Sequence, residues 1–142
     1  MQIGVDAQRA VENRRVFVID EGEVDRAALQ FMLADENETH EFATVQAAVV
    51  KGGDWPPDLV LLGASLLAAG RGDLVQGLRR AWPAVKVIAV CDTADIASVA
   101  DAKSTGADDA LPRPFTLENV RRKVDRLLGR RVELTIPVIV NR

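Results

Sequence analysis

The sequence has few of the residues on which redox, metal and multi-histidine chemistry depend. Its 142 residues include one cysteine, Cys91, one histidine, His40, and no tyrosine. A single cysteine excludes a disulfide within the chain, and one cysteine with one histidine cannot form a Cys/His zinc cluster. We interpret Cys91 as a small buried residue with an inert thiol, and His40 as an exposed residue of an edge strand.

The chain also has no large excess of positive or negative charge and no long apolar run. There are 18 Lys and Arg against 21 Asp and Glu, and hydrophobic residues make up 48% of the chain. The charge balance gives no sign of nucleic-acid binding, and the apolar content is sufficient for the core of one domain. No segment approaches the roughly 18 uninterrupted apolar residues of a membrane span. The first 15 residues mix charged with apolar residues, unlike a secretory signal, so we expect a cytoplasmic protein without a membrane segment.

Short apolar runs alternate with longer amphipathic segments. The runs lie at 15–20, 58–62, 85–90 and 109–111, and a weaker segment at 40–44 alternates polar and apolar residues as an edge strand does. This alternation predicts an α/β fold with a doubly wound, five-stranded parallel sheet and helices on both faces. We divide the chain into an N-terminal extension at 1–13, a domain at 14–129 and an extended tail at 130–142. The β-branched tail is expected to pack as an edge strand or to dock on a second copy.

Local signals define the expected helices. The first helix is predicted to bury one face that carries Val24, Ala27, Ala28, Phe31 and Met32. Thr93 and Thr116 are expected to cap later helices, and Gly106 to end one in a left-handed conformation. Segment 63–72 is rich in glycine and alanine, and is interpreted as a mobile loop or, alternatively, as an anion-binding loop.

Right-handed crossovers bring the C-terminal ends of all five strands to one edge of such a sheet. The residues predicted at that edge are Asp20, Glu21, Gly63, Cys91, Asp92 and Arg113. Three segments, 16–21, 57–62 and 106–115, fall in the order and spacing found in receiver domains of two-component response regulators. From about residue 14 to 128 the chain resembles this CheY-like family. The resemblance implies a flavodoxin-like sheet with strand order 2-1-3-4-5.

The resemblance also implies a phosphorylation pocket, and most of its residues are changed here. In the family, an acidic pair holds magnesium and an aspartate accepts a phosphoryl group, while a hydroxyl residue, a lysine and an aromatic residue respond. The acidic pair is matched by Asp20 and Glu21, but the other four positions fall on Gly63, Cys91, Arg113 and Ala110. Glycine has no nucleophile. We therefore predict a degenerate pseudo-receiver with no enzymatic activity and no cofactor, with Asp20 and Glu21 as the remaining candidate magnesium ligands.

These departures favour a binding function over catalysis. We expect Arg113 to pair with Asp20 or Glu21 and to hold the pocket closed. Arg121, Arg122 and Arg126 form a basic face on the last helix, predicted to bind a protein partner such as a histidine kinase, a response regulator or a scaffold. The alternative is a pseudo-receiver that senses a small molecule or nucleotide in the space vacated at Gly63.

Overall fold

The computed structural model describes residues 14–130, apart from the side chains of residues 71 and 72. The expected extension at 1–13 and nearly all of the expected tail lie outside the described residues. Five strands form one parallel sheet in the order β2-β1-β3-β4-β5, which confirms the predicted order. The strands are β1 (Arg15–Ile19), β2 (Glu38–Phe42), β3 (Leu59–Leu62), β4 (Lys86–Cys91) and β5 (Asp109–Pro112).

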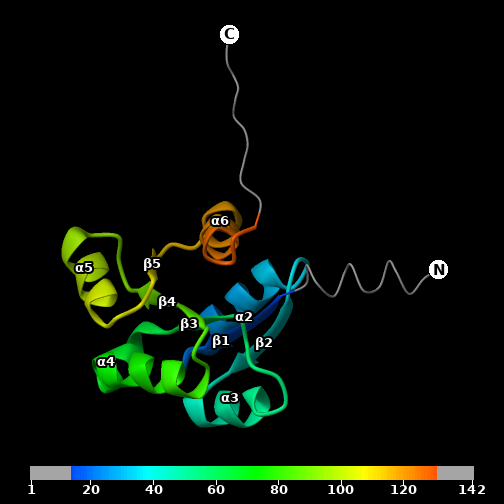
Figure 1. Cartoon of the computed structure of the whole chain (residues 1–142). Helices are drawn as coiled ribbons and strands as arrows, with labels where there is room; N and C mark the ends of the chain where they lie inside the picture. Colours follow the sequence, from blue (N-terminus) through cyan, green and yellow to red (C-terminus); the bar gives the residue numbers. More distant parts are fainter. Residues whose placement is uncertain (1–13, 131–142) are drawn as a thin grey trace.

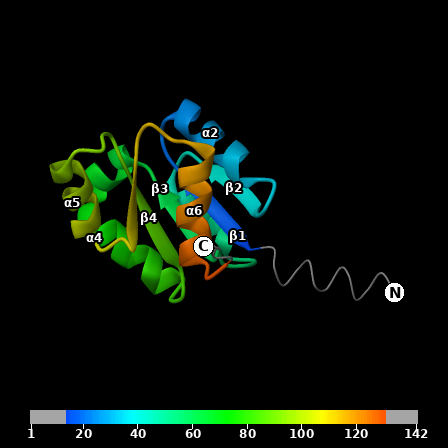
Figure 2. The same ribbon diagram turned by 90° about the horizontal axis from the view of Figure 1, so that it is seen from above.

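Helices cover both faces of the sheet, as Figures 1 and 2 show. They are α2 (Glu23–Leu33), α3 (Val45–Gly52), α4 (Ala64–Ala81), α5 (Ile96–Ser104) and α6 (Leu117–Leu127). One core lies between the sheet and α3, α4 and α5, around Phe17, Leu62 and Trp82. The other lies under α2 and α6, around Val18, Leu61 and Leu111. None of the helices within residues 14–130 is long and apolar enough to cross a membrane.

The buried face of α2 differs from the one that the sequence pattern indicates. Val24 and Phe31, predicted to be buried, are 81% and 80% exposed, whereas Leu29 and Leu33 are buried against the sheet. Val24 and Phe31 are seven residues apart, so they share a helix face, but Leu29 and Leu33 occupy the face that meets β1 and α6. A helix with two apolar faces does not reveal from its sequence alone which of them is packed.

Two other local expectations are corrected by the structure. The segment expected as a loop at 63–72 is the start of α4, which begins at Ala64. The N-cap of α5 is Asp95, whose carboxylate accepts from the Ser98 amide at 2.8 Å, while Thr93 donates to Asp95. The cap at Thr116 is confirmed, and so is the left-handed Gly106 at φ 98°.

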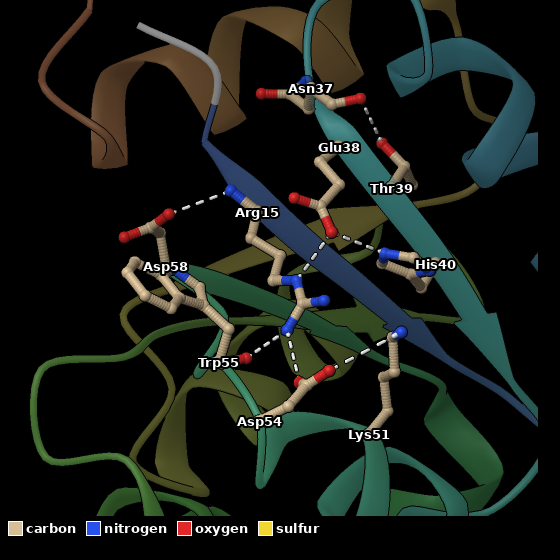
Figure 3. A network of polar contacts seen from close by, with 9 residues as sticks. All are labelled: Arg15, Asn37, Glu38, Thr39, His40, Lys51, Asp54, Trp55 and Asp58. Carbon is tan, nitrogen blue, oxygen red and sulfur yellow. Dashed lines mark hydrogen bonds and ion pairs between the residues drawn. The ribbon is translucent and has the colours of Figure 1, made fainter. Parts of the chain in front are cut away.

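A network of polar contacts centred on Arg15 joins β1, β2 and the segment before β3 (Figure 3). The Arg15 side chain is only 8% exposed, and its Nε donates to Glu38 at 2.8 Å. Its Nη1 donates to Asp54 at 3.2 Å and to the Trp55 carbonyl. The network lies at the N-terminal end of β1, opposite the edge where the family has its pocket. Its position gives it a structural role: it fixes the edge strand β2.

Replacement of Arg15 by lysine is expected to lower the free energy of unfolding by about 1 kcal/mol, because an ammonium cannot satisfy three separated acceptors with the geometry of a guanidinium. Glu38 and Asp54 are partly exposed and become hydrated, which limits the loss. Urea denaturation of the full chain measures the change, with Arg14→Lys as the matched control. Equal stability of the two variants would contradict a structural role for the network.

Candidate functional site: the C-terminal edge of the sheet

The predicted pocket residues meet at the C-terminal edge of the sheet. Parallel pairing sets Ile19 beside Leu62, and Cys91 beside Pro112. The residues that follow β1, β3 and β5, which are Asp20, Gly63 and Arg113, therefore come to the same edge, as the sequence predicted. The contacts among them differ from those expected.

Gly63 is a steric requirement of this site. A Cβ atom added at Gly63 would lie 2.6 and 2.7 Å from the two carboxyl oxygens of Asp20, closer than nonbonded atoms approach. The Gly63 backbone has φ −66° and ψ 151°, a conformation open to any residue, so glycine is needed for space and not for backbone freedom. The Asp20 carboxyl thus occupies the place of the side chain that a phosphoacceptor aspartate would have.

Asp20 is a buried carboxyl with incomplete hydrogen bonding. It is 4% exposed, and its Oδ1 accepts from the Gly22 amide at 2.8 Å. Its Oδ2 is buried and has no hydrogen-bond partner within the described part of the chain. Burial raises the pKa of Asp20, and this effect outweighs the lowering by the Gly22 amide and by the more distant Arg113. The site therefore disfavours the ionised form of Asp20 relative to an exposed aspartate.

The predicted ion pair between Arg113 and Asp20 or Glu21 is wrong. Arg113 pairs with Asp25 on α2, and with Asp92 after β4 at 2.7 Å. The hydrogen bond to Asp25 is the main cause that raises the pKa of Arg113. Asp25 lies 88 residues from Arg113 in the chain, and no spacing in the sequence linked them. The pair joins α2, β4 and the loop after β5 at the rim of the pocket.

Glu21 is exposed and accepts a hydrogen bond from Ser65 at 3.0 Å. The family's magnesium site would need Asp20 and Glu21 together with further oxygen ligands. Residues 14–130 contain no group of three His, Cys, Asp or Glu side chains that could hold a metal ion. The donor set that is present does not fit magnesium, and the absence of a metal cofactor stays a prediction.

Cys91 and Ala110 lie in the core at the two remaining switch positions. Cys91 is 3% exposed and Ala110 is 1% exposed, and both pack in the core shared with α4 and α5. Burial raises the pKa of the Cys91 thiol, which keeps it protonated at neutral pH. The alanine at position 110 has no ring that could swing between two positions. Neither residue provides the hydroxyl or the aromatic switch of the family.

Two of the three arginines predicted as an interaction face form ion pairs with acidic residues outside α6. Arg121 donates to the Met32 carbonyl at 3.2 Å and lies near Asp35 and Glu36, where it joins α6 to α2. Arg126 pairs with Asp109, a buried residue of β5 that also accepts from Lys123 at 3.3 Å. Arg122 is exposed and donates to Asn119 at 2.8 Å. Of the three, Arg122 is the one most available to a partner.

The sequence pattern did not reveal that the carboxylate of Asp109 is buried, because the pattern at 109–111 indicates only a short strand. Burial raises its pKa, but the Ala110 amide and Lys123 outweigh this effect and hold the pKa below its usual value. An acidic residue inside an apolar strand and a lysine fourteen positions later were the only signals available. Asp20 and Asp109 are equally buried, but their surroundings raise the pKa of Asp20 and lower the pKa of Asp109.

Comparisons with known proteins agree with this architecture, although no protein-family profile matches the chain. The KDP operon transcriptional regulatory protein KdpE of Escherichia coli K12 is 26% identical over 123 residues, which cover 86% of this chain and 54% of KdpE. The chain thus spans about half the length of this curated relative.

Solved structures give the same result for the fold. A response regulator from Thermotoga maritima superposes with a TM-score of 0.72 at 21% identity, over 83% of this chain and 99% of its own. NtrX from Brucella abortus, solved in complex with ATP, also reaches 0.72 at 22% identity, over 82% of this chain and 27% of its own. The sheet order and these solved structures show that the chain has the fold of these response regulators, and its sequence is similar to that of KdpE.

Proposed function

We propose that this domain acts in two-component-type signalling as a protein-interaction module that does not depend on phosphorylation. The observation that carries the proposal is the Asp20 carboxyl, which fills the position of an acceptor side chain beside Gly63. Phosphoryl transfer to a receiver needs a carboxylate nucleophile, a metal to neutralise charge, and a hydroxyl and a cation to hold the product. Gly63 has no nucleophile, Cys91 has no hydroxyl, and the Arg113 cation is already paired with Asp25 and Asp92.

Incubation of the full chain with acetyl phosphate and magnesium is expected to add no phosphoryl mass. Intact-mass spectrometry measures the result, with an ordinary receiver domain that contains an acceptor aspartate treated in the same reaction. The physical reason is that Gly63 has no side-chain nucleophile, and that burial limits access to the Asp20 carboxyl and raises its pKa. A stable adduct on Asp20 or Glu21, located by fragmentation after borohydride trapping, would contradict the proposal.

The proposed interaction surface is formed by α5, β5 and α6. Ile96 at the start of α5 is 88% exposed and Leu117 at the start of α6 is 46% exposed, and both are apolar. Arg122 adds a positive charge on α6, which favours an acidic partner such as a histidine kinase, a response regulator or a scaffold. A fixed domain can present such a surface permanently, because no phosphoryl group is required to shape it.

Arg122→Glu is the appropriate test of this surface. Arg126 is a poor choice because its charge reversal would leave the buried Asp109 facing a second carboxylate, and the fold itself would suffer. With Arg122→Glu we expect normal unfolding and reduced capture of the native partner from cell extract. Arg80→Glu, an exposed position on α4, is the matched control. Undiminished capture with Arg122→Glu would place the interaction on another face.

A further inference from the structure

A cavity of about 250 Å³ opens between α4 and α5, at the C-terminal end of β4. The space that the sequence predicted at Gly63 is taken by Asp20, and the hollow begins at the next residue, Ala64. The α4 side of the lining is apolar, with Ala64, Leu67 and Ala68, whereas the α5 side carries Ser98, Asp101 and Thr105. The volume is smaller than that of typical sites for drug-sized ligands, so it suits a compact molecule.

The hydrogen-bonding side chains of the described lining are mainly acceptors, although the Ser98 hydroxyl, which accepts from Thr93, keeps its own proton to donate. The Ser104 hydroxyl donates to the Asp101 carbonyl at 2.6 Å, and the Thr105 hydroxyl donates to the Ala102 carbonyl at 2.6 Å. Their protons are therefore used, and their oxygen lone pairs remain as acceptors. Ionised carboxylates only accept. Among the described residues that line the cavity, none has a nitrogen-containing side chain.

The charged side chains among the described lining residues are all acidic. Asp92 shares its carboxylate with Arg113, whereas the Asp101 carboxylate has no ion pair with any side chain that the structure describes. The start of α4 contributes a positive charge of only about half a unit, which does not balance one carboxylate. The described residues contain no group of three His, Cys, Asp or Glu side chains for a metal ion, and one carboxylate beside hydroxyl oxygens suits an ammonium group.

We propose that this cavity binds a small aliphatic amine. Its ammonium group donates hydrogen bonds to Asp101 and to the hydroxyl oxygens of α5, and its carbon chain lies against Ala64, Ala68 and the thiol of Cys91. The binding is noncovalent, because burial keeps the Cys91 thiol protonated and unreactive. The proposal is independent of the phosphorylation chemistry at Gly63, so either can fail without the other.

Titration of the ¹⁵N-labelled full chain with 1,4-diaminobutane tests the proposal, with sodium butyrate at equal ionic strength as the anionic control. We expect saturable amide shifts at Ser98, Asp101 and Thr105 with the diamine, and none with butyrate. Asp101→Asn should weaken the diamine about tenfold, the loss of one charge-assisted hydrogen bond. Asp73→Asn, an exposed acid of α4 outside the cavity, makes the same charge change and should alter the affinity less than twofold.

Ala68→Leu provides a second readout. Ala68 is exposed at the mouth of the cavity, so leucine can extend into the hollow without compressing the core, and it should abolish the shifts. Circular dichroism shows whether each variant is folded. If Ala68→Leu does not fold, Asp101→Asn alone is sufficient for the test. Equal weakening by Asp101→Asn and Asp73→Asn, equal binding of butyrate, or no saturation up to about 10 mM diamine would overturn the proposal.

Discussion

Gly63→Ala is expected to destabilise the domain by about 2 kcal/mol, although the backbone at this position accepts alanine without strain. The new methyl group would lie 2.6 Å from Asp20 Oδ2, and Asp20 is buried and has little room to rotate away. Urea denaturation of the full chain measures the change. Gly77→Ala is the matched control, because a Cβ there meets only the end of Arg80 at 3.9 Å.

Alanine at Gly77 removes a glycine from the interior of α4 and should stabilise the domain, by up to about 1 kcal/mol. A double-mutant cycle then identifies the cause of the loss at Gly63. Asp20→Ala removes the carboxyl that the new methyl group meets, so the variant with both substitutions should be more stable than Gly63→Ala alone. An unchanged cost of Gly63→Ala in the Asp20→Ala background would show that the clash with Asp20 is not the reason for glycine.

Asp20→Asn is expected to stabilise the domain at neutral pH by about 1 kcal/mol, whereas Asp109→Asn is expected to destabilise it by about 2 kcal/mol. The chemical change is identical, and both wild-type side chains are 4% exposed. Asparagine at 20 keeps an oxygen for the Gly22 amide and removes a buried charge that no cation contacts. Asparagine at 109 leaves Lys123 and Arg126 without their anion.

The pH dependence of the two variants should have opposite signs. The pKa of Asp20 is raised on folding, so wild-type stability from this group is fully present below its unfolded pKa and is lost as the pH rises through the folded pKa. The advantage of Asp20→Asn should therefore grow with pH from acid to neutral. The pKa of Asp109 is lowered on folding, so its contribution is present above the unfolded pKa and is lost as the pH falls through the folded value.

Thermal unfolding of both variants and the wild type between acid and neutral pH measures these trends. If Asp20→Asn lowers the stability at neutral pH, the wild-type carboxylate has a favourable contact in solution that compensates its charge. If the two variants respond to pH in the same direction, the different surroundings of Asp20 and Asp109 do not control their ionisation. Either result would also weaken the interpretation that burial penalises the charged form of Asp20.

The sequence alone was sufficient for the architecture. Apolar runs of strand length, separated by amphipathic segments, predicted the five-stranded parallel sheet, and the caps at Thr116 and Gly106 were correctly located. These features depend on local patterns, because each strand buries its own side chains and each helix end satisfies its own amides. The sequence also placed Gly63, a residue without a side-chain carboxylate, directly after a strongly apolar strand.

The partners of the charged residues were not visible in the same way. Arg113 was expected near Asp20 or Glu21 because all three lie at one sheet edge, and it pairs instead with Asp25 and Asp92. Long side chains can reach several acids at such an edge, and the choice depends on distances that only the assembled helices set. The same reason explains why α2 was given the wrong buried face, and why Arg126 was taken for a free surface charge.

The scarcity of cysteine, histidine and tyrosine by itself excludes whole classes of chemistry, and the order of apolar and polar segments determines the fold. The tertiary structure decides which group occupies the space beside Gly63 at the C-terminal edge of the sheet, and that group is the buried carboxyl of Asp20. It also decides where a cavity remains, between α4 and α5. The physical reason is that periodicity depends on neighbours in the chain, whereas burial, ion pairing and free volume depend on atoms brought together from distant segments.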